Sequence, residues 1–123
     1  HVGAAAKVNA AKLISHWINA GPGKGLPTIV MGDFTSAPDS EAYQVLTSGP
    51  LVDSRSASIA PPYGPPGTFT GFDIAQNAGM PIDHIFLSPD ILVDRYAVIT
   101  QHWGGRLPSD HYPVSAVLRL PDS

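Results

Sequence analysis

The spacing of apolar residues changes along this chain, and the order of the changes is the feature that most constrains its fold. Between Ala4 and Ile18, small and apolar residues recur every three or four positions, which predicts an amphipathic helix. The helix is expected to stop at Gly21 and Pro22, because glycine tolerates a left-handed C-cap and proline cannot continue the turn. Residues 28–33 have the sequence TIVMGD, and this continuous apolar run predicts a short strand buried on both faces.

One further helix and three further strands are expected downstream. The helix, about two to three turns long, is predicted in SAPDSEAYQVLTSGP, with Asp39 or Ser40 as its N-cap and Gly49 with Pro50 as its stop. The segment 54–80 is rich in proline and glycine and predicts a long surface loop, with TFTGF as a candidate brief strand. Strands are predicted in PIDHIFLS, ILVDRYAVIT and HYPVSAVLRL. This order indicates an α/β fold in which a mixed sheet carries helices on at least one face.

Composition limits the classes of partner and site. The 123 residues, 43% of them hydrophobic, suit one globular domain. The net charge of -3 gives no chain-wide positive field, so nucleic acid is not indicated as a partner, although a local phosphate site stays open. Because the chain has no cysteine, any metal would be held by oxygen or imidazole ligands. Neither a membrane span nor the apolar core of a signal peptide is present. A soluble chain is therefore expected, with secretion left open.

Three carboxylates stand at strand ends. Asp33 ends the first predicted strand, Asp83 begins the next, and Asp110 precedes the last. If these strands are neighbours, the carboxylates meet at one rim of the sheet, where open sheets tend to bind ligands. Each acid alone could simply stabilise a turn or a loop. Together they would repel one another unless a cation or the imidazolium of His111 joins them. A hard ion such as Mg²⁺ or Mn²⁺ would suit them, and the combination suits attack of water on a phosphoester.

Five segments, taken in order, resemble the second half of an endonuclease/exonuclease/phosphatase family domain. They are TIVMGDFTSAPDSEAYQVL, LVDSR, GTFTGF, IDHIFLS and LPSDHYPVSAVL. The resemblance runs through nearly all of the chain and is specific because the ordered set ends in SDH. It implies that residues 1–123 form a single partial domain, the C-terminal half of a four-layer α/β/β/α sandwich with a mixed sheet and flanking helices. It also implies a Mg²⁺- or Mn²⁺-dependent phosphoric ester hydrolase that cleaves a phosphodiester or a phosphomonoester with water.

The resemblance assigns roles to individual residues. Asp33 matches the acid that orients or activates the attacking water, and Asp83 matches the acid that supports the catalytic histidine. Asp110 matches a metal-associated acid, and His111 matches the phosphate-contacting histidine or general base. Thr35 stands where the family usually has asparagine; its hydroxyl can still donate to phosphate but is shorter and has one polar atom instead of two.

The family's first half carries an asparagine, a metal-binding glutamate and a second histidine, all expected upstream of His1. The resemblance therefore implies activity only with that N-terminal half, and it predicts that the chain pairs with the missing half or with another copy of itself. A second hypothesis is a non-catalytic interaction module that pairs through its open sheet face. Trp103 and Arg106 are candidate substrate contacts, because tryptophan can stack on a base or sugar and arginine can bind phosphate. Both could instead pack the loop before the last strand.

Overall fold

A computed structural model describes residues 3–34, 38, 40–70, 81–107 and 109–122. The helices are α1 (Ala4–Ala20), α2 (Glu41–Ser48) and α3 (Ser54–Ala57). The strands are β1 (Ile29–Asp33), β2 (Val52–Asp53), β3 (Asp83–Leu87), β4 (Leu92–Val98) and β5 (Val114–Arg119).

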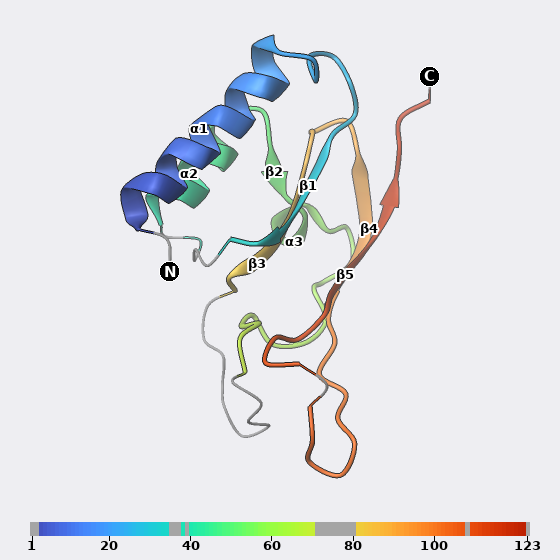
Figure 1. Ribbon diagram of the computed structural model, residues 1–123. Helices are drawn as coiled ribbons and strands as arrows, with labels where there is room; N and C mark the ends of the chain where they lie inside the picture. The colour runs from blue at the N-terminus through green and yellow to red at the C-terminus, as the bar shows by residue number, and fades with distance from the viewer. Residues whose placement is uncertain (1–2, 35–37, 39, 71–80, 108, 123) are drawn as a thin grey trace.

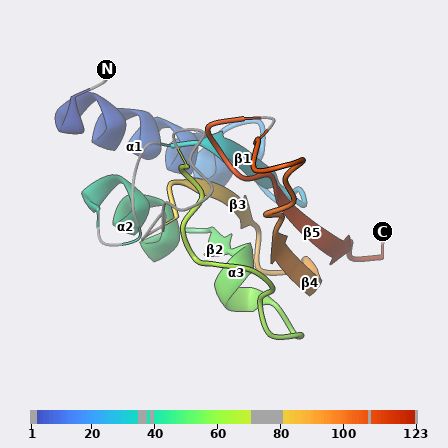
Figure 2. The ribbon, with the colours of Figure 1, turned by 90° about the horizontal axis from the view of Figure 1, so that it is seen from below.

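The strands form two sheets with the order β1-β3-β2 and β4-β5. Every ladder is antiparallel, and two isolated parallel bridges, Ser58 with Val93 and Tyr63 with Ala97, add parallel pairing along β4. Helices α1 and α2 cover one face of the three-stranded sheet, and the β4-β5 pair lies on its other side (Figures 1 and 2). The predicted α/β fold with flanking helices is therefore confirmed.

The helical layer packs as the apolar spacing predicts. Val8, Ala11 and Ile18 of α1 are buried against α2 and the sheet. The helix stops at Gly21 as expected, but this residue is extended (φ -96°) and not left-handed. Glycine is needed there because a Cβ would lie 2.8 Å from the carbonyl oxygen of Trp17. Lack of space, and not a positive φ, therefore accounts for glycine at this helix end.

Helix α2 begins after Ser40, one of the two residues predicted as its cap. The side-chain oxygen of Ser40 accepts a hydrogen bond from the backbone N–H of Tyr43 at 3.2 Å, which satisfies one of the free donors at the helix start. Ala42 and Leu46 are buried in the cluster that contains Phe86 of β3. The helix is therefore attached to the central strand of the sheet.

The prediction that the first strand is buried on both faces is wrong. Within the described residues β1 pairs only with β3, so it lies at an edge of its sheet. Val30 faces the helices and is half-buried, whereas Ile29 and Met31 are 43% and 72% exposed. Continuous apolar residues identify a strand but do not say whether both of its faces are covered by this chain.

The long predicted loop contains more structure than its composition indicates. Helix α3 begins directly after β2, and its N-cap is Asp53, whose carboxylate accepts a hydrogen bond from the N–H of Arg55 at 3.0 Å. In the candidate strand TFTGF, Phe69 forms an isolated antiparallel bridge with His111. The rest of that candidate, from residue 71, lies outside the described residues.

Candidate active site

The register of β1 and β3 brings two carboxylates together. Asp33 lies directly opposite Asp83 in the antiparallel ladder. Side chains alternate along a strand, and the neighbouring Phe34 and His84 pack with Phe86 on the helix side, so both acids face the β4-β5 side. Like charges directly opposite each other in a sheet are destabilising. This pair therefore needs a positive partner.

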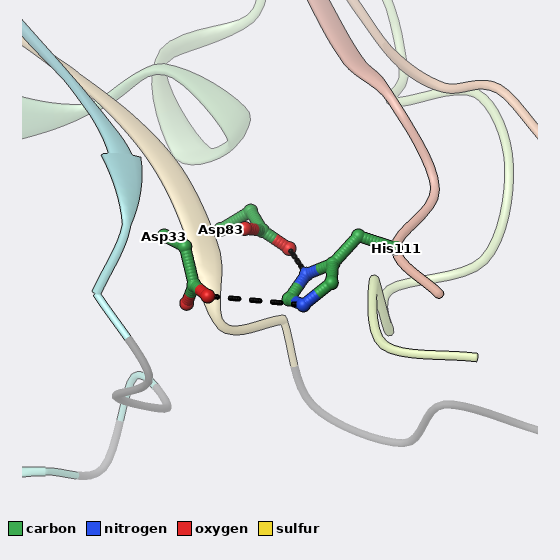
Figure 3. Close-up of side chains that lie close together, drawn as sticks. All are labelled: Asp33, Asp83 and His111. Carbon is green, nitrogen blue, oxygen red and sulfur yellow. Dashed lines mark hydrogen bonds and ion pairs between the residues drawn. The ribbon is translucent and has the colours of Figure 1, made fainter. Parts of the chain in front are cut away.

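His111, in the segment that leads into β5, supplies that partner. Its Nδ1 atom lies 2.7 Å from Oδ2 of Asp83, and its Nε2 atom lies 3.7 Å from Oδ2 of Asp33 (Figure 3). An ionised carboxylate can only accept, so Nδ1 carries the hydrogen of the shorter contact. The imidazole thus lies between two acids that would otherwise repel each other.

The acids favour the charged form of the imidazole. The hydrogen bond to Asp83 raises the pKa of His111 above its ordinary value, and the charges of Asp83, Asp33 and Asp110 raise it further. Partial burial opposes this effect but does not cancel it. His111 is consequently protonated at a higher pH than a free histidine.

The cluster is open to solutes. A cleft of about 300 Å³ is lined by residues 31–33, 83–85 and 111–114. The side chain of Asp33 is 43% exposed, and those of His111 and Asp83 are 25% and 18% exposed. A small ligand can therefore reach all three side chains from one cleft.

The three side chains fit a divalent cation. One potential ligand atom from each of Asp33, Asp83 and His111 lies within 4.8 Å of the others. Carboxylate oxygens suit Mg²⁺, and a mixed oxygen and imidazole set also suits Mn²⁺. Asp110, the predicted metal ligand, is not in this group. It lies next to it in sequence, and its charge acts on His111.

The other predicted site residues lie elsewhere or outside the description. Trp103 and Arg106 are exposed and face each other at the end of a hairpin, where each backbone N–H donates to the other's carbonyl oxygen at 2.9 and 3.0 Å. Gly104 and Gly105 make the connecting turn with φ values of 58° and 82°, a conformation that favours glycine. Thr35 lies outside the described residues.

Sequence reasoning missed Phe69 as a member of the site. This residue is 39% exposed, and its ring meets the His111 ring edge-on with centroids 5.4 Å apart. A buried polar group beneath the site was also missed: the Tyr43 hydroxyl donates to Asp53 at 2.7 Å, and Nδ1 of His84 lies 4.0 Å from the same carboxylate. The only signal in the sequence was the position of Phe69 inside a recognised segment, GTFTGF.

Comparison with known proteins identifies the family. The model of the endonuclease/exonuclease/phosphatase family matches residues 2–111, and the chain belongs to this family. Among solved structures, it is similar to a mannosyl-6-phosphatase from Bacteroides thetaiotaomicron, with 36% identity and a TM-score of 0.89 over 98% of this chain and 48% of that one.

Two further family structures have the same extent of similarity. One from Bacteroides thetaiotaomicron has 37% identity and a TM-score of 0.87, covering 96% of this chain and 45% of that one. One from Bacteroides vulgatus has 31% identity and a TM-score of 0.81, covering 98% of this chain and 46% of that one. The chain thus spans just under half the length of these structures.

Comparison with curated proteins found no match. In the part of the chain that the structure describes, no helix has the length and apolar character to cross a bilayer.

Proposed function

We propose that this chain is the C-terminal catalytic part of a divalent-metal-dependent phosphoesterase that hydrolyses a phosphodiester or a phosphomonoester. The observation that carries the proposal is the cluster of Asp33, Asp83 and His111 in one open cleft. Membership of the family supports the reaction class, and the name of one structural neighbour, a mannosyl-6-phosphatase, favours a phosphomonoester.

Each member of the cluster has a chemical task. Asp83 holds Nδ1 of His111, which leaves Nε2 as the ring atom available to substrate. In the protonated form, favoured by the raised pKa of His111, Nε2 donates a hydrogen bond to a phosphate oxygen. Asp33 lies within 3.7 Å of the same ring and orients or deprotonates the attacking water. The proposed reaction therefore uses two acids in different roles around one imidazole.

The proposed metal site uses the same acids. Asp33 and Asp83 would hold Mg²⁺ or Mn²⁺, with Asp110 as a further candidate ligand from the resemblance. When bound, the ion neutralises charge on the phosphoryl group. Because His111 already neutralises part of the acidic charge, metal and proton are expected to compete: protonation of His111 weakens binding of the cation.

We further propose that activity needs the remainder of the family domain, which would include a segment N-terminal to this one. The chain covers 48% of its phosphatase-named neighbour. Ile29 and Met31 on β1 and Val117 on β5 are exposed apolar side chains on strands, which supports pairing with another sheet. This one partial domain would take either the missing half or a second copy as its partner.

Those exposed strands also favour the second candidate, a non-catalytic interaction module that binds another polypeptide through its open sheet face. The two functions make different demands on the cluster. A module would bind its partner equally well after Asp33→Asn, because that acid contributes nothing to an apolar contact. The intact mass of the native assembly shows whether a second polypeptide is present, and hydrolysis by that assembly, lost in Asp33→Asn, separates the enzyme from the module.

The proposed substrate contacts are Trp103 and Arg106. Their backbone pairing across a two-glycine turn fixes them as neighbours on one hairpin, so a ring and a guanidinium are presented together. Such a pair suits a phosphate ester of a sugar or nucleoside, since the indole can stack on the ring and the guanidinium can bind the phosphate.

The test is phosphatase activity of the chain combined with its N-terminal half, measured on mannose 6-phosphate and on a nitrophenyl phosphodiester. Hydrolysis is expected with Mg²⁺ and should vanish with a chelator. Asp33→Asn and His111→Ala should each lower kcat by at least about a hundredfold. Asp94→Asn, an acid paired with Arg119 on the surface of β4, is the matched control and should change little. Equal activity of Asp33→Asn and Asp94→Asn would contradict the proposal.

Thr35→Asn tests the departure from the family pattern. If the hydroxyl is a weaker substitute for the family's amide, asparagine should raise kcat or leave it unchanged. A large loss would mean that the site is adapted to the hydroxyl and that the role assigned to Thr35 is wrong. The substitution is compared with the unaltered assembly at saturating substrate, so that a change in KM is not mistaken for a change in kcat.

A further inference from the structure

The contact between Asp83 and His111 joins two different sheets. Asp83 begins β3 in the β1-β3-β2 sheet, and His111 precedes β5 in the β4-β5 sheet. In the described part of the chain, β3 and β5 are not partners in a ladder. The 2.7 Å contact between Asp83 and His111 is therefore not set by strand register. Some other residue has to align the two backbones.

Thr68 is bonded to both of these backbones. Its side-chain oxygen accepts hydrogen bonds from the N–H groups of Ile82 and Asp83 at 3.1 and 3.2 Å. Its carbonyl oxygen accepts from the N–H of Tyr112 at 2.7 Å. The residue has 0% exposure, so water cannot replace these bonds.

The residues next to Thr68 continue the same connection. The N–H of Thr70 donates to the carbonyl oxygen of Asp110 at 2.6 Å, and the Phe69 ring packs edge-on against His111. Residues 68–70, named here the TFT segment, thus run beside residues 110–112. Among the described contacts, only the side chain of Thr68 links the TFT segment to the N–H of Asp83.

The link extends to the third member of the cluster. The carbonyl oxygen of Ile82 accepts from the N–H of Phe34 at 3.0 Å, directly after Asp33. One set of hydrogen bonds therefore connects the backbones around Asp33, Asp83 and His111. The side-chain oxygen of Thr68 joins the part of this set at the start of β3 to the part beside His111.

We propose that Thr68 is a positioning residue whose buried hydroxyl holds the start of β3 against the segment carrying His111 and so sets the Asp83–His111 contact. The proposal rests on the proposed function for its effect on catalysis, but the contact itself can be measured without any activity. Thr68 is fully buried and is not among the residues that line the cleft. It acts through the placement of Asp83.

The competing explanation is that Thr68 only stabilises the fold, as buried threonines commonly do. A purely structural role predicts that its loss lowers stability while the folded molecules keep the Asp83–His111 hydrogen bond. A positioning role predicts that the bond itself weakens in the folded molecules. The measurement therefore has to report on the bond and not only on the amount of folded protein.

The experiment compares Thr68→Val with Thr68→Ser in the full chain. Valine keeps the shape and removes the acceptor, whereas serine keeps the acceptor. The first readout is the proton resonance of the His111 Nδ1–H group in ¹⁵N-labelled protein, assigned by its loss in His111→Ala. We expect Thr68→Val to lose or broaden this resonance and Thr68→Ser to retain it. Thr70→Val, which alters a buried hydroxyl bonded to Ser109 at 3.3 Å, is the control and should also retain it.

The second readout is kinetic and uses the chain combined with its N-terminal half. We expect Thr68→Val to lower kcat by about tenfold to a hundredfold, the scale of a small misplacement of a catalytic group, with KM changed by less than about threefold. Thr68→Ser should restore kcat to within about threefold of the unaltered protein, since the acceptor is again present. Combined with Asp83→Ala, which removes the acceptor of this contact, the valine substitution should add no further loss, because the contact that Thr68 positions is already absent.

Two outcomes overturn the proposal: a Thr68→Val protein that keeps the Nδ1–H resonance, or a Thr68→Ser protein that loses it. If the valine variant does not fold, Thr68→Cys replaces it, since sulfur is a weaker acceptor than oxygen in a side chain of similar shape. Equal resonances in the cysteine and serine variants would then refute the role of the acceptor. Absence of hydrolysis in the unaltered assembly would refute the proposed function, while the resonance would still decide the role of Thr68.

Discussion

Asp83→Asn should separate catalysis from folding at this site. The substitution keeps the size of the side chain but replaces a charge-assisted hydrogen bond of 2.7 Å by a neutral one. A hydrogen bond to a charged group contributes about 1.5–3 kcal/mol, so its full loss in the transition state would lower kcat by about 10- to 150-fold. The lower part of this range is expected, because the asparagine carbonyl can still accept from Nδ1 of His111.

The same substitution should change the pH dependence in a defined direction. The hydrogen bond to Asp83 is the largest cause of the raised pKa of His111, so Asp83→Asn lowers that pKa. The limb of the kcat profile that reports His111 should therefore move to lower pH. A raised histidine pKa stabilises the fold below the ordinary pKa of about 6.5, and the contribution is lost as pH rises through the raised value. Above that value the variant should lose little stability, since it also removes the repulsion between Asp33 and Asp83.

The assay is a kcat profile against pH for the chain combined with its N-terminal half, alongside urea unfolding at two pH values. The surface substitution Asp94→Asn serves again as the matched control. A kcat within about threefold of the unaltered protein and an unmoved limb would refute the reasoning, because neither the bond nor the pKa of His111 would then depend on Asp83.

Three other predictions concern stability and assembly. Tyr43→Phe removes the hydroxyl that donates to Asp53, which is only 6% exposed, and should lower the free energy of unfolding in urea by about 1.5–3 kcal/mol. Tyr63→Phe, at a 72% exposed site, should lower it by less than about 0.5 kcal/mol. Similar values for the two variants would contradict the importance of the buried bond. Gly64→Ala places a Cβ 2.3 Å from a carbonyl oxygen of β4 at a φ of 86°. At Gly25, φ is 79° and nothing lies within 4 Å of the added Cβ. The free energy of unfolding should therefore fall by at least about 1 kcal/mol more in Gly64→Ala than in Gly25→Ala. In light scattering, the chain should self-associate when alone and form a complex when its N-terminal half is added. A monodisperse monomer with a cooperative melt would contradict the proposal that an open sheet face needs a partner.

Local patterns predicted α1 and α2 well because their signals are local, whereas the short helix α3 lies in a segment that was predicted as a loop. The spacing of Val8, Ala11 and Ile18 indicates which face of α1 is buried, and Ser40 caps α2 through a residue three positions away. The burial of β1 was predicted wrongly because Ile29 and Met31 have the same sequence context at an edge as in the centre of a sheet. Position in a sheet depends on which other strands are present, and an apolar run contains no information about that.

The candidate site was predicted in part, through family resemblance and strand ends. Asp33, Asp83 and His111 were named, but their distances depend on pairing between segments that lie far apart in the sequence. Nothing in the spacing of these residues predicts that Thr68 bonds the backbones of both Asp83 and Tyr112. Such a link becomes visible only when the two sheets are placed against each other.

The division of the cluster between two sheets also couples ligand binding to folding. Asp33 and Asp83 belong to one sheet and His111 leads into the other, so a ligand held by all three groups acts as a crosslink between the sheets. A ligand that binds only when the two sheets are packed together stabilises the folded chain by mass action. The free energy of unfolding rises by about 2.7 kcal/mol when the ligand concentration is a hundred times Kd. Hydrogen exchange should then slow in β4 and β5 as well as beside the ligand, and thermal unfolding becomes a binding assay that requires no turnover.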